Sequence, residues 1–232
     1  MSILSRVLYI SGSCLVLNKL KGEAVEGAKN GIVDLQKELK KADPERIKFI
    51  EAVNRIDVPV TGCSLFALSE PALEYLNASF SGKNDQTIEK YYWAITEKPK
   101  KHPPGNGELV HWIETKSKGN KSFVYNKETP NCKKAKLKYT IKGEGTNYLF
   151  VEIQLISGRH HQIRAQLAAI GLYIKGDLKY GAKRSEKNGG IRLHSRQLVF
   201  TDPLSPVKKV NIIADPPEPD NLWNAFLTGF NQ

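Results

Sequence analysis

Residues 156–181 read I-S-G-R-H-H-Q-I-R-A-Q-L-A-A-I-G-L-Y-I-K-G-D-L-K-Y-G, and this stretch is the most informative in the chain. It brings two arginines and two adjacent histidines together at its start. Such a cluster indicates a negatively charged partner, either a carboxylate of the protein or a phosphate of a ligand. Ile163 and Leu167 follow at helical spacing, and Gly171 stands where a helix end favours a left-handed residue. The pattern predicts a short helix behind the cluster.

Length and charge limit what the protein can be. The chain has 232 residues and a formal net charge of +11. This length suits one large domain or two closely packed lobes. The positive charge indicates a polyanionic partner, with nucleic acid ahead of an anionic membrane. Because the sequence has neither an apolar run of about 20 residues nor a basic amphipathic helix, we expect no membrane partner.

The cysteines and the N-terminus indicate a cytoplasmic protein. Cys14, Cys63 and Cys132 are odd in number and form no C-x-x-C pair, which favours a reducing compartment. Cys14 and Cys63 lie among apolar residues and are expected in the core. The apolar stretch 7–17 is broken by Ser-Gly-Ser and lacks a cleavage site, so it predicts a β-hairpin rather than a signal peptide.

Further along the chain, apolar patterns predict mainly strands. Buried or half-buried strands are expected at residues 65–68, 89–96 and 149–155. Ser69 is a plausible helix N-cap with a proline in the first turn, so a helix should run towards Phe80. Residues 31–49 suit either a surface helix or a mobile segment. The mixture lacks regular βαβ alternation, which favours an α+β fold with a largely antiparallel sheet.

The segment 115–142 is strongly basic, with nine lysines and one acidic residue. Its Thr, Tyr, Phe and Val content predicts exposed strands and loops. Two interpretations stay open for this segment: a solvated lysine-rich face, or a surface that binds nucleic acid.

A second element, Asn54-Arg55-Ile56-Asp57, could supply the carboxylate that the first cluster indicates. Asp57 precedes the turn-forming stretch Val-Pro-Val-Thr-Gly. An aspartate in such a loop is often a turn residue that bonds its own backbone. Spacing alone therefore leaves the structural and catalytic roles of Asp57 open.

Taken together, these motifs resemble the RluA family of RNA pseudouridine synthases. "NRIDVPVTG" is similar to the family's H-R-L-D-x-x-T-S-G, and "EKYYWAI" to K-x-Y-x-A. The stretch 156–181 resembles G-R-x-H-Q-I-R-x-H-L-A-x-x-G…G-D-x-x-Y-G over its whole length, and "IRLHSRQLVFTDP" resembles L-H-A-x-x-L-x-F-x-H-P. Asn54 departs from the family histidine, and Leu20-Lys21 departs from the usual N-K-P-x-G.

The resemblance implies a fold: a mixed, largely antiparallel central sheet flanked by helices, with two lobes around a catalytic cleft. We expect the catalytic domain at residues 1–214. The proline-rich stretch after it should begin a C-terminal extension at residues 215–232. The extra N-terminal RNA-binding module of many relatives is not expected.

The resemblance also implies roles for individual residues. Asp57 corresponds to the catalytic carboxylate, Arg164 to the arginine that pairs with it, and Tyr92 to the tyrosine that stacks on the target base. Arg55 corresponds to a residue that fills the space of the flipped base. Further RNA contacts are expected at Lys90, Arg159, His161, Gln162, Lys175, Lys179, Lys183 and Arg184.

The implied reaction is the isomerisation of uridine to pseudouridine in structured RNA, either ribosomal or transfer RNA, at a stem-loop uridine. No metal or organic cofactor is implied, and a monomer is the default expectation. His160 and His161 are adjacent and no H-x-x-x-H or cysteine pair occurs, which argues against a metal site. The main alternative is a catalytically inactive RNA-binding protein that retains the fold.

Overall fold

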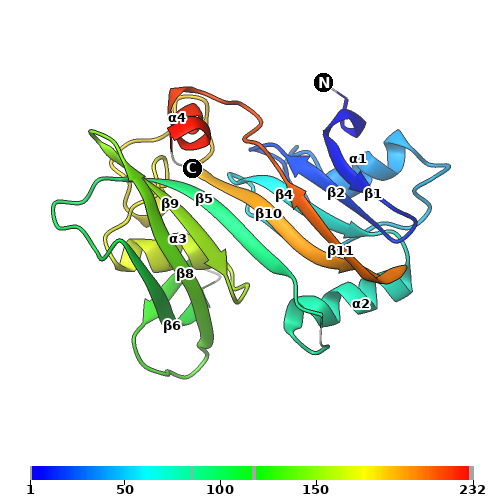
Figure 1. The fold of residues 1–232 in the computed structure, drawn as a ribbon, viewed down its shortest axis with the longest axis horizontal. Helices are drawn as coiled ribbons and strands as arrows, with labels where there is room; N and C mark the ends of the chain where they lie inside the picture. Colours follow the sequence, from blue (N-terminus) through cyan, green and yellow to red (C-terminus); the bar gives the residue numbers. More distant parts are fainter. Residues whose placement is uncertain (1, 85, 117–118, 230–232) are drawn as a thin grey trace. The chain divides into compact units, whose positions relative to one another are not determined.

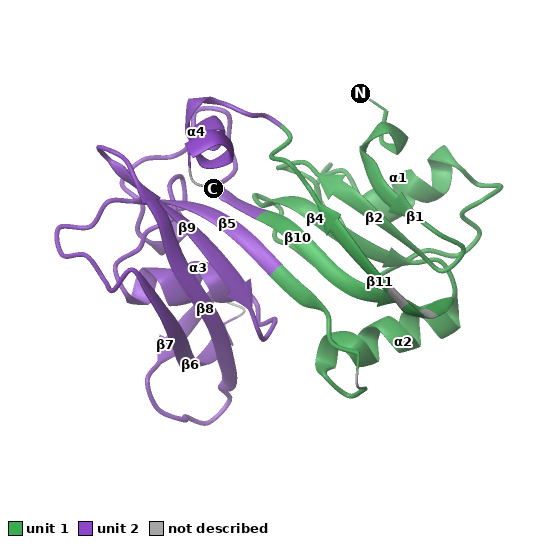
Figure 2. Ribbon diagram, viewed as in Figure 1, with its two compact units in different colours: residues 1–90, 195–217 green, residues 91–194, 218–232 purple. Residues whose placement is uncertain are grey.

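The computed structural model describes nearly the whole chain, namely residues 2–84, 86–116 and 119–229. The chain forms two compact units, one made of residues 1–90 and 195–217, the other of residues 91–194 and 218–232 (Figure 2). Each unit combines antiparallel strands with helices, as the sequence pattern predicts (Figure 1).

The first unit contains strands hydrogen-bonded in the order β1-β2-β4-β10, and β3 also pairs with β4 and β11 with β10. Its elements are η1 (Leu4–Arg6), β1 (Val7–Ile10), β2 (Cys14–Lys19), α1 (Leu35–Ala42), β3 (Glu51–Ala52), β4 (Thr61–Ala67), α2 (Glu70–Ser81), most of β10 (Leu193–Asp202) and β11 (Ser205–Ile213).

Local sequence signals account for most of these elements. The predicted hairpin is confirmed, since β1 and β2 pair antiparallel across the Ser-Gly-Ser turn. The N-cap of α2 is also confirmed, because the Ser69 side chain accepts a hydrogen bond from the Ala72 N–H. Gly82 ends α2 in the left-handed conformation with φ of 67°. Within residues 31–49, α1 begins after the cap Asp34 and buries its two leucines.

The core of the first unit lies between α2 and the strands. Leu76 of α2 packs with Leu65 of β4 and Phe200 of β10 in one buried cluster. Cys14 and Cys63 belong to the same cluster, which confirms that they are core residues. Burial of this apolar surface is the main stabilising contribution to the unit.

The second unit is built on a sheet with strand order β5-β9-β8-β6-β7, and all its neighbouring strands run antiparallel. Its elements are β5 (Glu89–Glu97), β6 (Asn106–Lys116), β7 (Lys121–Tyr125), β8 (Lys133–Glu144), β9 (Tyr148–Leu155), α3 (Gln162–Ala169), η2 (Leu178–Tyr180) and α4 (Asn221–Gly229).

The strands β5 and β9 and the helix α3 confirm the predictions for residues 89–96, 149–155 and the cluster at 156–181. α3 packs on one face of the sheet, where the Gln166 amide donates hydrogen bonds to the carbonyls of Leu109 in β6 and Ala135 in β8. The basic segment 115–142 forms the end of β6, β7 and most of β8. The part of this segment at 117–118 lies outside the described residues.

The C-terminal segment differs from the extension expected at residues 215–232. Residues 218–232 belong to the second unit, and α4 supplies Trp223 and Phe226 to its core. The Phe226 ring stacks on Trp93 at 4.2 Å between centroids and meets Phe150 edge-on at 5.5 Å. The proline-containing stretch after Ala214 therefore connects β11 to a helix of the core. Only the contacts of α4 with β5 and β9 show that this helix belongs to the core.

Candidate active site

Asp57 lies in the loop that leads from β3 into β4, and both ends of this loop are anchored. At its start, the buried side chain of Asn54 bonds to the backbone of β4, as a neighbouring strand would. Its Oδ1 accepts a hydrogen bond from the Leu65 N–H at 2.6 Å, and its Nδ2 donates to the Cys63 carbonyl at 3.4 Å. Asp57 itself is half-buried, and its carbonyl accepts the Val60 N–H at 2.9 Å. The loop therefore holds Asp57 in a fixed backbone turn.

The other end of the loop is anchored by Lys19, the last residue of β2. Its side chain is 0% exposed, and Nζ donates to the carbonyls of Leu20, Val58 and Val60 at 2.8, 3.1 and 2.7 Å. Burial lowers the pKa of Lys19 to about 7, while the nearby charges of Glu23 and Asp57 raise it. The lysine thus binds the backbone that follows Asp57 and places a cationic group near its carboxylate.

Sequence reasoning missed this function of Lys19. The available signal was the pair Asn18-Lys19, which fits the first two letters of the N-K-P-x-G pattern. Leu20, which follows this lysine, departs from the pattern. The sequence shows Asn54 only as a departure from the family histidine, whereas the structure shows its two hydrogen bonds to the backbone of β4.

Arg55 points away from this anchored backbone. Its side chain is 77% exposed, and the guanidinium lies 3.4 Å from the Glu26 carboxylate. An exposed ion pair of this kind contributes little to stability. Arg55 can therefore exchange its carboxylate partner for another acceptor, and its contact with RNA stays a prediction.

In the second unit, Arg164 forms a buried, bidentate ion pair with Asp177. Nε and Nη2 of the arginine donate to the two carboxylate oxygens at 2.7 and 2.8 Å. The same guanidinium lies over the ring of Tyr180, 5.0 Å from its centroid. Sequence reasoning missed Asp177 as a partner, although it is the aspartate of the quoted G-D-x-x-Y-G motif. The predicted pair of Arg164 with Asp57 joins residues of two different units and stays a prediction.

The histidines before α3 make hydrogen bonds and ring contacts within the loop and with Tyr180. The His161 backbone is left-handed, with φ of 50°, and its Nδ1 lies 2.9 Å from the Tyr180 hydroxyl. His160 stacks on His161 with ring centroids 3.8 Å apart. Tyr180 also accepts the Ser122 N–H at 2.8 Å, and burial raises its pKa. Among the described residues, no group of His, Cys, Asp or Glu has the arrangement of a metal site.

Several residues expected to contact RNA are buried. The Gln162 amide bonds to Ser157, Arg159 and Lys136 at 2.9 to 3.1 Å, which fixes the turn before α3. Lys90 is 4% exposed and lies over the Phe80 ring, and burial lowers its pKa to about 8. His161 and Gln162 are likewise buried. In this structure, all three side chains make contacts inside the protein, and their contact with RNA stays a prediction.

The remaining predicted residues range from buried to exposed. Tyr92, the predicted base-stacking residue, is 6% exposed within β5 and pairs in register with Ile153. Lys175 is half-buried and paired with Glu186, and burial lowers its pKa. The exposed cations of the set are Arg159, Lys179, Lys183 and Arg184. Lys179 donates to the carbonyls of Gly119 and Asn120, which ties η2 to the hairpin between β6 and β7.

Comparison with known proteins identifies the family. Residues 13–169 match the family model described as RNA pseudouridylate synthase. The chain belongs to this family. The resemblance predicted from the sequence is thereby confirmed, and the match includes both the Asp57 loop and the Arg164 helix.

The relatives of this chain include bacterial proteins with longer chains. It is 29% identical to ribosomal large subunit pseudouridine synthase C of Vibrio cholerae, over 90% of the chain and 64% of that relative. It is 31% identical to the protein of the same name from Rickettsia bellii, over 91% of the chain and 68% of the relative. The chain thus spans less than two thirds of the Vibrio cholerae protein.

A solved structure confirms the fold. Human RNA pseudouridylate synthase domain containing 4 matches with a TM-score of 0.71 and 21% sequence identity. The match covers 97% of this chain and 92% of the human chain. The predicted α+β pseudouridine synthase fold is therefore correct.

Proposed function

We propose that this protein is an RNA pseudouridine synthase that isomerises uridine in structured RNA. The observation that carries the proposal is the anchored loop of Asp57, which lies inside the region matched by the family. Asn54 and Lys19 hold its backbone at both ends, so a carboxylate is presented in a defined place without being fully buried. A turn residue with only a local role would need neither anchor.

The reaction breaks the bond between the sugar and N1 of uracil and forms a bond between the same sugar carbon and C5. The base rotates between these steps, N1 gains a proton and C5 loses one. A carboxylate assists as a nucleophile or as a stabiliser of positive charge on the sugar. We assign this role to Asp57. The charge of Lys19 interacts with that of Asp57, and we propose Arg164 as a second cation that acts with this carboxylate.

The target uridine must leave its stack to react, which costs a few kcal/mol. Stacking on an aromatic ring such as that of Tyr92 returns about 1–3 kcal/mol. Arg55 is exposed and can fill the space that the flipped base leaves. The net charge of +11 supports binding to phosphates, and that binding should weaken steeply with salt.

The names of the relatives favour ribosomal RNA of the large subunit as the first substrate to test, with transfer RNA second. We propose a monomer that acts in the cytoplasm. Within the described residues, no helix is long and apolar enough to cross a membrane.

The proposal is tested by incubating the purified protein with unmodified transcripts of large-subunit ribosomal RNA and of transfer RNA. The RNA is digested to nucleosides, and pseudouridine is separated from uridine by chromatography with mass detection. We expect pseudouridine in at least one RNA. Salt-sensitive RNA binding without any pseudouridine would instead favour the inactive RNA-binding protein.

A further inference from the structure

A continuous series of cations and aromatic rings leads away from Arg164. Its guanidinium lies 5.0 Å from the ring centroid of Tyr180, and Nζ of Lys121 lies 5.2 Å from the same centroid. The same Nζ lies 5.9 Å from the ring of Phe123, which Lys116 approaches at 5.1 Å. Lys121, at the start of β7, therefore connects the surroundings of Arg164 to a ring at the end of the sheet.

Beyond Lys121, aromatic and basic side chains share one face of the sheet. The register pairs Trp112 of β6 with Tyr125 of β7 and with Lys134 of β8, and pairs Glu114 with Phe123. Because side chains alternate along a strand, these residues point to one side, while their neighbours Ile113, Ser122 and Ala135 are buried on the other. The buried side is the one on which α3 packs.

We call the outward face of β6, β7 and β8, with Trp112, Phe123 and Lys134 at its centre, the outer face. Phe123 is 39% exposed, and Nζ of Lys134 lies 5.7 Å from the Trp112 ring. β7 ends the strand order, so this face continues to the edge of the sheet. An exposed ring beside ammonium groups offers a stacking surface and a charge at the same place.

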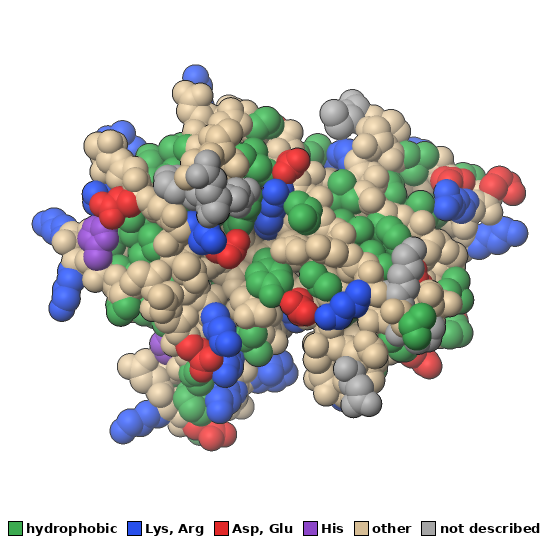
Figure 3. Space-filling view, viewed as in Figure 1, with side chains coloured by type: hydrophobic (Ala, Val, Ile, Leu, Met, Phe, Trp, Pro, Cys, Tyr) green, Lys and Arg blue, Asp and Glu red, His purple; other side chains and the backbone are tan. Residues whose placement is uncertain are grey.

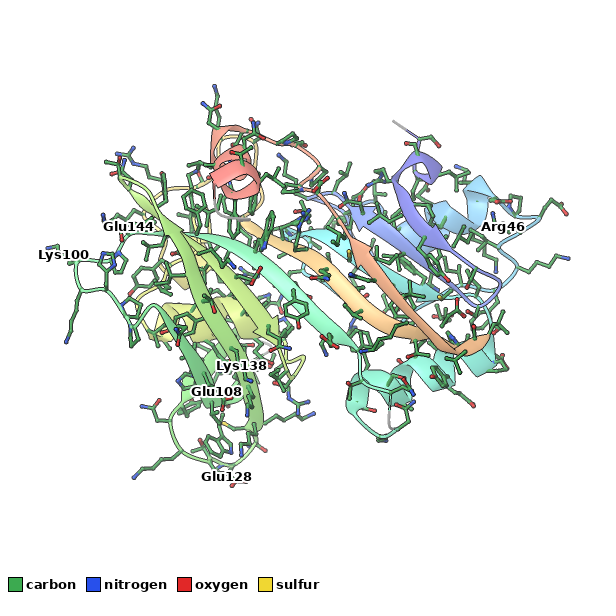
Figure 4. The ribbon with its side chains drawn as sticks, viewed as in Figure 1. Arg46, Lys100, Glu108, Glu128, Lys138 and Glu144 are labelled. Atoms are coloured by element: carbon green, nitrogen blue, oxygen red, sulfur yellow. The ribbon has the colours of Figure 1, made fainter. Side chains whose placement is uncertain are left out.

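The charge of the outer face is predominantly positive. Among the described outward side chains of β6, β7 and β8, lysines outnumber carboxylates, and Glu108 and Glu114 each pair with a lysine. Figure 3 shows basic side chains gathered over β8 with acidic ones among them, and Figure 4 labels Lys138 and Glu108 in this area. Excess positive charge interleaved with aromatic rings matches single-stranded nucleic acid, whose bases stack and whose phosphates bind cations.

We propose that the outer face binds the single-stranded RNA that flanks the target uridine. Bases stack on Phe123 and Trp112, and phosphates contact Lys116, Lys121 and Lys134. Lys121 contacts the rings of both Tyr180 and Phe123, so the outer face adjoins the surroundings of Arg164. The inference rests on the proposed function for its choice of RNA, but the surface itself lies outside the predicted catalytic residues.

The test measures binding of a fluorescently labelled single-stranded RNA by anisotropy. The variants Phe123→Leu and Trp112→Leu keep apolar bulk but remove the rings, and Val110→Ala changes an exposed apolar residue of the same face as the matched control. Each ring variant should bind roughly tenfold more weakly, because base stacking on one aromatic residue contributes about that factor. The control should bind like the wild type, and thermal melting checks that all three fold.

A second probe separates stacking from charge. An abasic strand of equal length keeps every phosphate but lacks bases at the flanking positions. The wild type should prefer the base-bearing strand, whereas the double variant of Phe123 and Trp112 should lose most of that preference. Lys134→Gln should weaken binding of both strands alike and reduce its dependence on salt.

The two proposals fail in different ways. If the ring variants bind base-bearing RNA as tightly as the wild type while the wild type forms pseudouridine, the outer face is not an RNA surface and the proposed function stands. If the ring variants lose the base preference but no RNA is modified, the outer face binds RNA and the proposed activity is wrong.

Discussion

The pair of Arg164 and Asp177 should contribute to folding as well as to the site. Both side chains are buried. Removing one partner leaves an uncompensated buried charge, which destabilises the folded protein by about 3–5 kcal/mol. We therefore predict that Arg164→Ala lowers the free energy of unfolding by that amount, measured by urea denaturation. Arg159→Ala, which changes an exposed arginine in the loop before α3, should change stability by less than about 0.5 kcal/mol. Wild-type stability of Arg164→Ala would contradict the buried pair.

Lys19 should give stability a specific pH dependence. Burial lowers its pKa to about 7 in the folded protein, compared with the ordinary value of 10.5. Between these values the unfolded chain binds more protons, so the free energy of unfolding rises with pH. Below about pH 7 both states are protonated, and the full destabilising effect of burying the charge is present.

The comparison of wild type with Lys19→Met tests this dependence. Between pH 6 and pH 9, the free energy of unfolding measured with urea should increase more for the wild type than for Lys19→Met. Lys40→Met, at an exposed position of α1, serves as the control and should follow the wild type. Equal gains for wild type and Lys19→Met would show that the lysine keeps its ordinary pKa in the folded protein.

Among the elements, β4 depends on a glycine at its start. Gly62 has φ of 109°, and a Cβ there would lie 2.3 Å from the Ser195 carbonyl oxygen in β10. Gly62→Ala should therefore destabilise the protein by on the order of 3 kcal/mol, from backbone strain and from overlap with a neighbouring strand. A Cβ at Gly82 would have no atom within 4 Å, so Gly82→Ala should lower stability only through backbone strain, by about 1 kcal/mol. Similar losses for both variants in urea denaturation would contradict the close approach of β4 to β10.

The helix α4 should be required for a stable second unit. Phe226 is fully buried against Trp93 and Phe150, so Phe226→Ala should lower the free energy of unfolding by about 3–5 kcal/mol. Leu178→Ala, at an exposed apolar position of the same unit, is the control and should have little effect. Calorimetric melting of Phe226→Ala at the wild-type temperature would show that residues 215–232 are a dispensable extension.

Elements with complete local signals could be predicted, and those that depend on distant partners could not. The cap Ser69 predicts the start of α2 from the sequence, and apolar patterns predict β5 and β9. By contrast, α4 follows a proline-rich stretch, and only its packing on Trp93 shows that it belongs to the core. The site divides in the same way: motif positions such as Asp57 and Arg164 were evident, but the side-chain partners Lys19 and Asp177 required three-dimensional contacts.

For the molecule as a whole, the net charge and the family match both indicate RNA as the partner. A net charge of +11 supplies attraction to phosphate that does not depend on sequence. The family match supports the proposed chemistry, and the carboxylate that we propose for it, Asp57, lies in an anchored loop. RNA binding and isomerisation should therefore be separable, since the phosphate contacts and the reacting carboxylate belong to different side chains.

The measurement that tests the central claim most directly is tritium release from RNA labelled at C5 of uridine, comparing wild type with Asp57→Asn. Asparagine keeps the size of the side chain and removes its charge, so folding and salt-sensitive RNA binding should persist. We predict release by the wild type and none by the variant. Equal release by both proteins would show that Asp57 is not the catalytic carboxylate, and release by neither would contradict the proposed activity.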